Sequence, residues 1–257
     1  MRNKAALITG GATGIGKRTA FMLAAKGIDL VINYRSSQKE AVSLCGELSG
    51  KYGTRNIALQ GDISITDDCV MMAEAALNEF PVIDILIHNA GPYVHERKEM
   101  LDYTFEQWNY LINGNLNAVF YLSKLFIPKM RETGWGRIIT IGFDRVEYSS
   151  GWVYRSAFAA AKTGAASLTK SIALEESGNG ITANMVCPGD ITGEWKEKNI
   201  EEAAGAYESA SPVGRPGTGE DIARVISFLT DEKSDFITGS IIPVTGGKDV
   251  LGKIYQE

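Results

Sequence analysis

The chain has 257 residues, of which 44% are hydrophobic and 22% charged, a composition that suits one well-filled α/β core and excludes a disordered or fibrous protein. Twenty-six basic residues stand against 31 acidic ones, and the net charge of -5 argues against a nucleic-acid partner. No apolar run approaches the roughly 18 to 20 residues that span a bilayer, and residues 1–4 do not begin a signal peptide. We therefore expect a cytoplasmic protein with no membrane partner.

Short apolar stretches alternate along the chain with segments that have the apolar spacing of helices. The stretches predict strands at residues 4–9, 28–34, 56–60, 82–87, 137–141, 181–186 and 240–244. Parallel strands need a crossover helix, and strands that are apolar throughout are covered on both faces. We expect an α/β fold of the Rossmann type: a doubly wound parallel sheet of about seven strands, with helices on both faces. No repeat or linker divides the chain, so residues 1–257 are expected to form one domain.

Three helix starts carry residues suited to capping. Thr66-Asp67-Asp68, Thr104 with Gln107, and Thr218 with Asp221 each place a hydroxyl and an acidic or amide side chain where first-turn N–H groups need acceptors. These are folding signals without functional content.

A glycine-rich segment follows the first predicted strand directly. It reads Thr9-Gly10-Gly11-Ala12-Thr13-Gly14-Ile15-Gly16, and the predicted helix 17–25 begins where it ends. Glycines let backbone N–H groups approach a pyrophosphate, and a helix N-terminus directs partial positive charge toward it. The strand-turn-helix context predicts a dinucleotide site.

The end of the second predicted strand indicates which dinucleotide is bound. An acid at this place accepts from the ribose 2'-hydroxyl of NAD(H), whereas a basic side chain pairs with the 2'-phosphate of NADP(H). The sequence here is Asn33-Tyr34-Arg35-Ser36-Ser37, with no acid, and Lys17 is expected to add positive charge nearby. We therefore predict NADP(H), the alternative being that Arg35 is a solvated loop residue.

Cysteine and histidine are too few for a metal centre. Cys45, Cys69 and Cys187 form no CxxC pair, which indicates small buried hydrophobes in a reducing compartment rather than disulfides or a zinc site. The two histidines, His88 and His95, have no acidic partners at ligand spacing, so no metal is expected.

The motifs together resemble the short-chain dehydrogenase/reductase family, and within it the 3-oxoacyl-(acyl carrier protein) reductases. TGGATGIG is similar to TGxxxGxG, and further matches are Gly61-Asp62-Ile63, His88-Asn89-Ala90-Gly91, Asn113-Gly114-Asn115-Leu116, Pro188-Gly189, Gly214-Arg215-x-Gly217 and Thr245-Gly246-Gly247. The resemblance covers essentially the whole chain. It implies these cofactor-binding residues: Thr9, Gly10, Thr13, Gly14, Ile15, Gly16, Asn33, Tyr34, Arg35, Ser36, Asp62, Ile63, Asn89, Ala90, Gly91, Lys162, Pro188, Gly189 and Thr192.

Of the four catalytic residues that the resemblance implies, this sequence has two with the family's residue type. Asn115 and Lys162 match the family's asparagine and lysine. Phe158 stands at the position of the proton-donating tyrosine, and Phe143 at that of its serine partner. Reduction of a carbonyl needs a hydrogen bond and then a proton at the oxygen, so ordinary ketone reduction by the family's mechanism is expected to be severely weakened.

Another hydroxyl could replace the missing acid. Tyr154, eight residues before Lys162, qualifies only if the chain bends before the helix begins, and Tyr148, Ser149 and Ser150 are further candidates. His88 is expected to be a hydrogen-bonded supporting residue rather than an acid. Residues 93–103 and 191–207 are expected to form lids over the site.

Several functions stay open at this level. The first is an NADP(H)-dependent reductase of a small-molecule or acyl-thioester carbonyl, as in fatty acid biosynthesis; the second is a binding protein that serves as sensor, scaffold or inactive partner subunit. An enoyl-thioester reductase has less support because Arg155 occupies the expected tyrosine offset. The resemblance also implies a homo-oligomer, in particular a homotetramer, through residues 109–130 and 157–173.

Overall fold

The computed structural model describes residues 2–209 and 211–248. Those residues form the strands β1 (Ala5–Ile8), β2 (Asp29–Tyr34), β3 (Asn56–Gln60), β4 (Ile85–His88), β5 (Gly136–Ile141), β6 (Ile181–Pro188) and β7 (Ile241–Val244). The α-helices are α1 (Gly14–Ala24), α2 (Gln38–Tyr52), α3 (Thr66–Glu79), α4 (Phe105–Ile112), α5 (Ala118–Thr133), α6 (Ser156–Glu176) and α7 (Gly219–Leu229). Short helical turns are η1 (Met100–Asp102), the π-helix η2 (Asn113–Asn117), η3 (Val146–Tyr148), η4 (Ser177–Asn179), η5 (Gly193–Glu197), η6 (Glu201–Ala203) and η7 (Glu232–Ser234).

The strands form one parallel sheet in the order β3-β2-β1-β4-β5-β6-β7, which confirms the predicted fold. The chain winds outward in one direction to β3, returns to the centre, and winds in the other direction from β4 to β7. The order therefore reverses between β1 and β4, whose residues Ile8 and Ile87 are paired. A crevice at the carboxyl ends of these two strands is the usual ligand position in such sheets.

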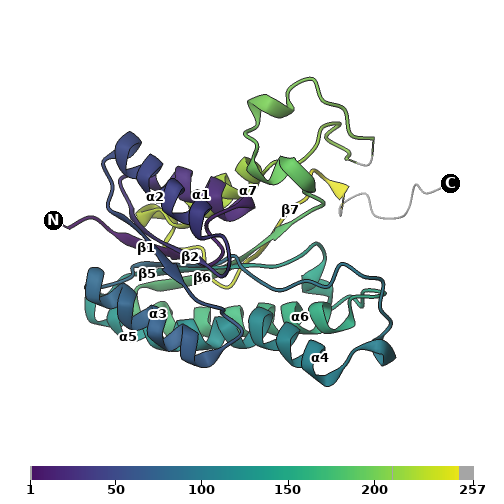
Figure 1. Cartoon of the computed structure of the whole chain (residues 1–257), viewed down its shortest axis with the longest axis horizontal. Helices are drawn as coiled ribbons and strands as arrows, with labels where there is room; N and C mark the ends of the chain where they lie inside the picture. The colour runs from purple at the N-terminus through teal and green to yellow at the C-terminus, as the bar shows by residue number, and fades with distance from the viewer. Residues whose placement is uncertain (1, 210, 249–257) are drawn as a thin grey trace.

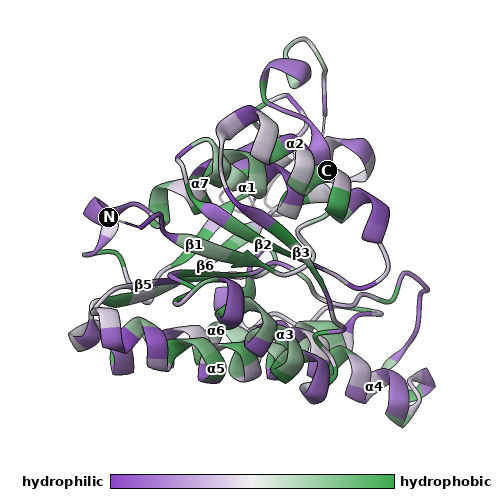
Figure 2. Cartoon of the chain, turned by 60° about the vertical axis from the view of Figure 1, so that its left-hand side comes forward, coloured by the Kyte–Doolittle hydropathy of each residue, from purple (hydrophilic) through white to green (hydrophobic). Residues whose placement is uncertain are grey.

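Helices cover both faces of the sheet (Figure 1). Helices α1, α2 and α7 lie on one face, and α3, α4, α5 and α6 on the other. Successive strand side chains enter opposite layers, so Ile8 packs with the α1 side and Leu7 with the α3 and α5 side. Figure 2 shows the apolar strands between helices whose outer faces are polar. The two-sided burial is the reason why the strands are apolar throughout.

The start of one predicted strand and one predicted helix cap differ from the structure. Residues 82–84 precede β4 because Asp84 turns its carboxylate to the Arg2 guanidinium and the Ala5 N–H. The capping boxes at Thr104 and Thr218 are confirmed. The predicted cap at Thr66 is wrong, since α3 begins at Thr66 itself and its residue Asp68 accepts instead from the N–H of Asp62.

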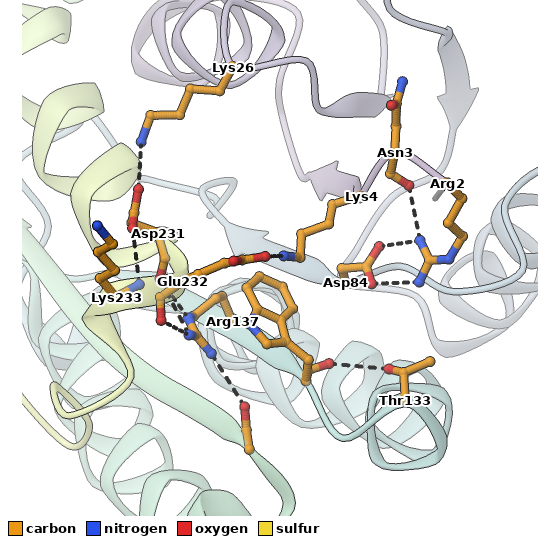
Figure 3. Close-up of polar contacts among 12 residues, drawn as sticks. Arg2, Asn3, Lys4, Lys26, Asp84, Thr133, Arg137, Asp231, Glu232 and Lys233 are labelled. Carbon is orange, nitrogen blue, oxygen red and sulfur yellow. Dashed lines mark hydrogen bonds and ion pairs between the residues drawn. The ribbon is translucent and has the colours of Figure 1, made fainter.

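Arg137, near the amino-terminal end of β5, forms a network of hydrogen bonds at that edge of the sheet (Figure 3). Arg137 is only 1% exposed. Its guanidinium donates to backbone carbonyls of Gly136, Gly180, Asp231 and Glu232 at 2.9–3.3 Å, and lies 4.4 Å from the Trp135 ring centroid. It thereby ties η7 and the start of β6 to β5.

The three cysteines are buried free thiols, as expected. None of the helices in the described ranges is long and apolar enough to cross a membrane.

Candidate dinucleotide and catalytic site

The turns after β1 and β4 are joined at the point where the strand order reverses. Asn89 donates from its side chain to the carbonyls of Thr9 and Gly10, at 2.9 and 3.2 Å, and the N–H of Ala90 donates to the Thr9 hydroxyl. A Cβ on Gly16 would lie 2.8 Å from the Asn89 amide nitrogen and closer still to the Gly10 carbonyl. Only glycine therefore fits between the first helical turn and the loop after β4.

A cavity of about 420 Å³ opens beside this junction. Its lining residues are Gly10, Asn33, Arg35, Gly61, Asp62, Ile63, Ala90, Gly91, Pro92, Tyr93, His95 and Tyr110. Asn33 shapes the wall by accepting from the Gly10 N–H and donating to the Gly61 carbonyl. Many residues that the sequence assigned to the cofactor therefore meet in one space.

Arg35 lies at the mouth of this cavity with an exposed side chain. Its guanidinium is 3.7 Å from the Asp62 carboxylate and donates to the Tyr110 hydroxyl. Tyr34, in contrast, is buried in the core, and Ser36 is exposed and does not line the cavity. Lys17 differs from the expectation because its ammonium pairs with Glu197 at 2.8 Å instead of adding charge beside Arg35.

Glu197 of η5 lies over the start of α1. Its carboxylate accepts from the Gly14 N–H at 2.9 Å as well as from Lys17. Partial burial would raise the pKa of Glu197, but these two hydrogen bonds hold it below its ordinary value. The segment that follows β6 thus contacts the helix N-terminus, and Thr13 and Gly14 line the hollow between them.

Pro188, Gly189 and Thr192 stand at the end of β6, where the sequence placed one wall of the site. Gly189 and Thr192 line a second cavity of about 280 Å³, together with Val244 of β7 and with Val213 and Arg215. A Cβ on Gly189 would lie 2.9 Å from the Cα of Thr245, so glycine lets the loops after β6 and β7 approach closely.

Asn115 and Lys162 converge on Gly91. Both side chains are buried, at 1% and 4% exposure, and a Cβ on Gly91 would contact the Asn115 carboxamide and lie 3.3 Å from Lys162 Nζ. The Asn115 amide nitrogen donates to the Pro92 and Leu111 carbonyls, while its Oδ1 has no hydrogen-bond partner in the part of the chain that the structure describes. A buried acceptor, Asn115 Oδ1, thus lies near Lys162 without a hydrogen bond from the described residues.

Backbone geometry gives Asn115 this position. It lies in the π-helix η2 between α4 and α5, and π-helical insertions recur at functional sites because they re-aim side chains. Lys162 lies on α6 and donates to the Ile141 carbonyl at 2.7 Å, where burial lowers its pKa to about 8. The ammonium has two more N–H groups to offer.

His88 is the last residue of β4 and is 3% exposed. Its Nε2 lies 3.4 Å from the Ser123 hydroxyl. Burial, and next the charge of Lys162, lower the pKa of His88 to about 3. The ring is therefore neutral near pH 7, which agrees with a supporting residue rather than an acid.

Aromatic rings fill the region where the resemblance places hydroxyl groups. Phe143 and Phe158 have ring centroids 6.1 Å apart, and Trp152 packs on both at 5.4 and 6.0 Å. Tyr93 meets Phe158 edge-on at 5.1 Å. Lys162 Nζ lies 5.8 Å from the Phe158 centroid, so the cluster borders the buried ammonium.

The substitute acids named from the sequence are placed less favourably. The chain does bend at Tyr154, whose φ is 65° and which precedes the first residue of α6, Ser156. Within the described residues, however, Tyr154 is not among the rings that pack on Phe158. Tyr148 on η3 is 74% exposed. From the sequence, Tyr93 is expected only at the start of the lid 93–103, two residues after Gly91, and is not named as a substitute acid.

Geometry and fold define a doubly wound α/β protein with a candidate nucleotide cavity where the strand order reverses, and with a lysine and an asparagine against Gly91 of its lining. A family model described as Enoyl-(Acyl carrier protein) reductase matches residues 10–249. The chain is 51% identical over 249 residues to "Putative oxidoreductase YtkK" of Bacillus subtilis, covering 96% of this chain and 97% of that protein. It is 34% identical over 247 residues to the 3-oxoacyl-[acyl-carrier-protein] reductase FabG of Haemophilus influenzae, with 96% and 98% covered.

Solved structures agree with the sequence relatives. A "putative 3-oxoacyl-reductase from bacillus thuringiensis" matches with a TM-score of 0.88 and 47% identity, covering 95% of this chain and 98% of that one. Acetoin dehydrogenase YohF from Salmonella typhimurium matches with a TM-score of 0.89 and 27% identity, covering 99% of both chains. The chain belongs to the short-chain dehydrogenase/reductase family, whose members resembling it here are oxidoreductases.

Proposed function

We propose that this protein is an NADP(H)-dependent reductase of a carbonyl group, on a small molecule or an acyl thioester of the 3-oxoacyl type. The observation that carries the proposal is the unpartnered Oδ1 of buried Asn115 near Lys162. Both side chains lie against Gly91, which lines the cavity together with Arg35. A buried acceptor without a partner is costly unless a ligand or water completes it.

The residues present fit a nicotinamide dinucleotide phosphate. The cradle at Gly10 and Gly16 suits a pyrophosphate, Asp62 and Ile63 would hold the adenine, and Arg35 would pair with a 2'-phosphate. The bound cofactor would supply hydride. Lys162 would hold its ribose, while Asn115 would order a water or the substrate beside it.

Phe143 and Phe158 occupy the serine and tyrosine positions in this proposal, so the catalytic site is degenerate with respect to the family pattern. Their rings exclude water from the reacting region but supply no proton. The acid must then come from another side chain.

A second candidate is a protein that binds NADP(H) without reducing a carbonyl, as sensor, scaffold or inactive subunit. The packing of Phe143 on Phe158 at 6.1 Å favours it. Enoyl-thioester reduction, to which the family description refers, is the third candidate, with Arg155 at the expected tyrosine offset against it.

The proposal extends to the whole molecule. We propose that residues 1–257 form one domain, that the protein works in the cytoplasm as a homo-oligomer, in particular a tetramer, and that its partner is a small molecule rather than nucleic acid, membrane or metal. Support comes from the single parallel sheet, the reduced cysteines and apolar side chains exposed on α5, α6 and α7: Phe120, Leu174 and Phe228.

Titration of nicotinamide fluorescence tests the cofactor directly. The unmodified protein should bind NADPH more tightly than NADH. Arg35→Ala should lower the affinity for NADPH by about 10- to 100-fold, because charge-assisted hydrogen bonds are lost, and should change the affinity for NADH little. Lys39→Ala, an equal loss of charge at an exposed position of nearby α2, is the control. Equal affinities of the unmodified protein for NADPH and NADH would remove the NADP(H) assignment.

Turnover tests the reaction. The protein should consume NADPH with a short 3-oxoacyl thioester and leave the matched 2-enoyl thioester unreduced. Tight NADPH binding without reduction of either thioester or of a small ketone such as acetoin would instead make the protein an NADP(H)-binding module.

A further inference from the structure

Tyr93 places a phenol at the wall of the nucleotide cavity. It follows the turn after β4, and it lines the cavity of about 420 Å³ together with Gly10, Asp62 and Gly91. Its ring meets Phe158 at 5.1 Å with an interplanar angle of 85°. Helix α6 contains no tyrosine, but the ring that packs against Phe158 carries a phenol hydroxyl.

The hydroxyl of Tyr93 has a charged neighbour. Nε of Arg155 donates to its oxygen at 2.6 Å, and the guanidinium carbon lies 4.9 Å from the ring centroid. Because the oxygen accepts this hydrogen bond, the phenol proton stays available to a second acceptor. A guanidinium in contact also stabilises the negative charge that remains once that proton has left.

Arg155 is held in place by backbone groups. Its terminal nitrogens donate to the carbonyls of Glu96 at 2.7 Å, Tyr154 at 2.7 Å and His95 at 3.1 Å. It is the N-cap residue of α6, about one turn before Phe158 and two turns before Lys162. Arg155 therefore fastens the loop after β4 to the helix that carries Lys162.

We propose that Tyr93 is the proton donor of this site and that Arg155 is its positioning residue; the inference rests on the proposed reductase function. The bound cofactor would supply hydride to the substrate carbonyl carbon, and the C=O π pair would move to oxygen. Tyr93 would donate its phenol proton to that oxygen, leaving an alcohol, the oxidised cofactor and a Tyr93 phenolate beside Arg155. With 37% of Tyr93 exposed, solvent returns the proton.

Tyr93→Phe is the decisive variant because it removes one oxygen and keeps the ring packing. With a 3-oxoacyl thioester, kcat should fall by about 10²- to 10⁴-fold, the usual cost of losing a general acid. KM, the NADPH dissociation constant and the melting temperature should change little. Tyr154→Phe and Tyr148→Phe are the matched controls: each removes one phenol oxygen from a ring that does not line the cavity, and each should keep most of the activity.

Arg155→Met and Arg155→Lys test the positioning role. Met should lower kcat at least about 10-fold, with KM and NADPH affinity nearly unchanged, and Lys should restore part of kcat because it returns a cationic donor. A crystal structure with NADPH and a 3-oxoacyl thioester should show Tyr93 Oη within about 3.2 Å of the substrate oxygen.

The outcomes separate the two proposals. Carbonyl reduction that survives in Tyr93→Phe overturns the donor assignment and leaves the reductase function intact, and the control variant that loses activity then identifies the acid. An unmodified protein that binds NADPH but reduces no carbonyl overturns the reductase function, and the donor assignment with it.

Discussion

Phe158 lies one helical turn before Lys162, and its ring fills the volume of a tyrosine without the hydroxyl. If Tyr93 is the donor, the substitution Phe158→Tyr adds a second phenol that the unmodified protein does not need. The same substitution should matter once Tyr93→Phe has removed the first phenol. We expect Phe158→Tyr to raise kcat of Tyr93→Phe by at least about 10² in thioester reduction.

Neither substitution in this pair changes ring volume, so melting temperatures should match within a few degrees. Lack of any gain in Tyr93→Phe/Phe158→Tyr would show that the position of Phe158 is not equivalent to that of the family tyrosine.

His88 contributes a pH dependence of stability. Its pKa in the folded protein is about 3, below the ordinary value of 6.5, because burial and next Lys162 disfavour its charged form. The unfolded chain therefore binds the extra proton between these values, and this contribution to stability is lost as pH falls through that range. Between pH 7 and pH 5 the loss from His88 alone should be about 2 kcal/mol.

Urea unfolding of the unmodified protein and of His88→Asn at the two pH values isolates this contribution, since the other titrating groups cancel in the comparison. The stability of the variant should fall by less on acidification. An identical fall in both proteins would show that His88 is not held neutral.

At the scale of elements, the Arg137 network in Figure 3 makes a further prediction. Arg137→Met keeps an unbranched apolar stem but removes donors from four buried or partly buried carbonyls. We expect a loss of about 2–4 kcal/mol in the free energy of unfolding, because unsatisfied buried acceptors and lost cation–π packing add to each other.

Lys129→Met, which breaks the exposed pair of Lys129 with Glu132, is the control and should cost under about 1 kcal/mol. NADPH affinity should be unchanged in both variants, because the network lies at the sheet edge opposite the cofactor cavity. Equal stabilities of the two variants would contradict a structural role for the guanidinium.

At the scale of the whole molecule, the exposed apolar residues of α5 and α6 are consistent with self-association. Light scattering at micromolar concentration should give a mass of about four times 27.8 kDa. Leu174→Glu, at a position 82% exposed in the single chain, should lower this mass, whereas Val42→Glu on α2 should not. A mass near 27.8 kDa for the unmodified protein would contradict the tetramer.

Local features of the sequence determined much of the fold of this protein. Continuous apolar strands, the glycine turn 9–16 and the capping boxes at Thr104 and Thr218 act over a few residues, so their outcomes could be predicted without a partner in space. The position of Arg35 beside the cavity was likewise predictable. Arg35 directly follows β2, and ligands bind at the carboxyl ends of the strands in a parallel sheet.

Tertiary structure decided the rest. Lys17 was expected near Arg35, but Glu197, distant in sequence, binds it. The π-helix that re-aims Asn115 and the contact of Arg155 with Tyr93 have no local signature, because each depends on which loop packs against which helix. The spacing along one helix is enough to judge whether a residue four or eight positions before Lys162 could serve as the acid. Only the folded chain could bring in a phenol 69 residues away in sequence, since contacts between loops after different strands are set by the sheet order.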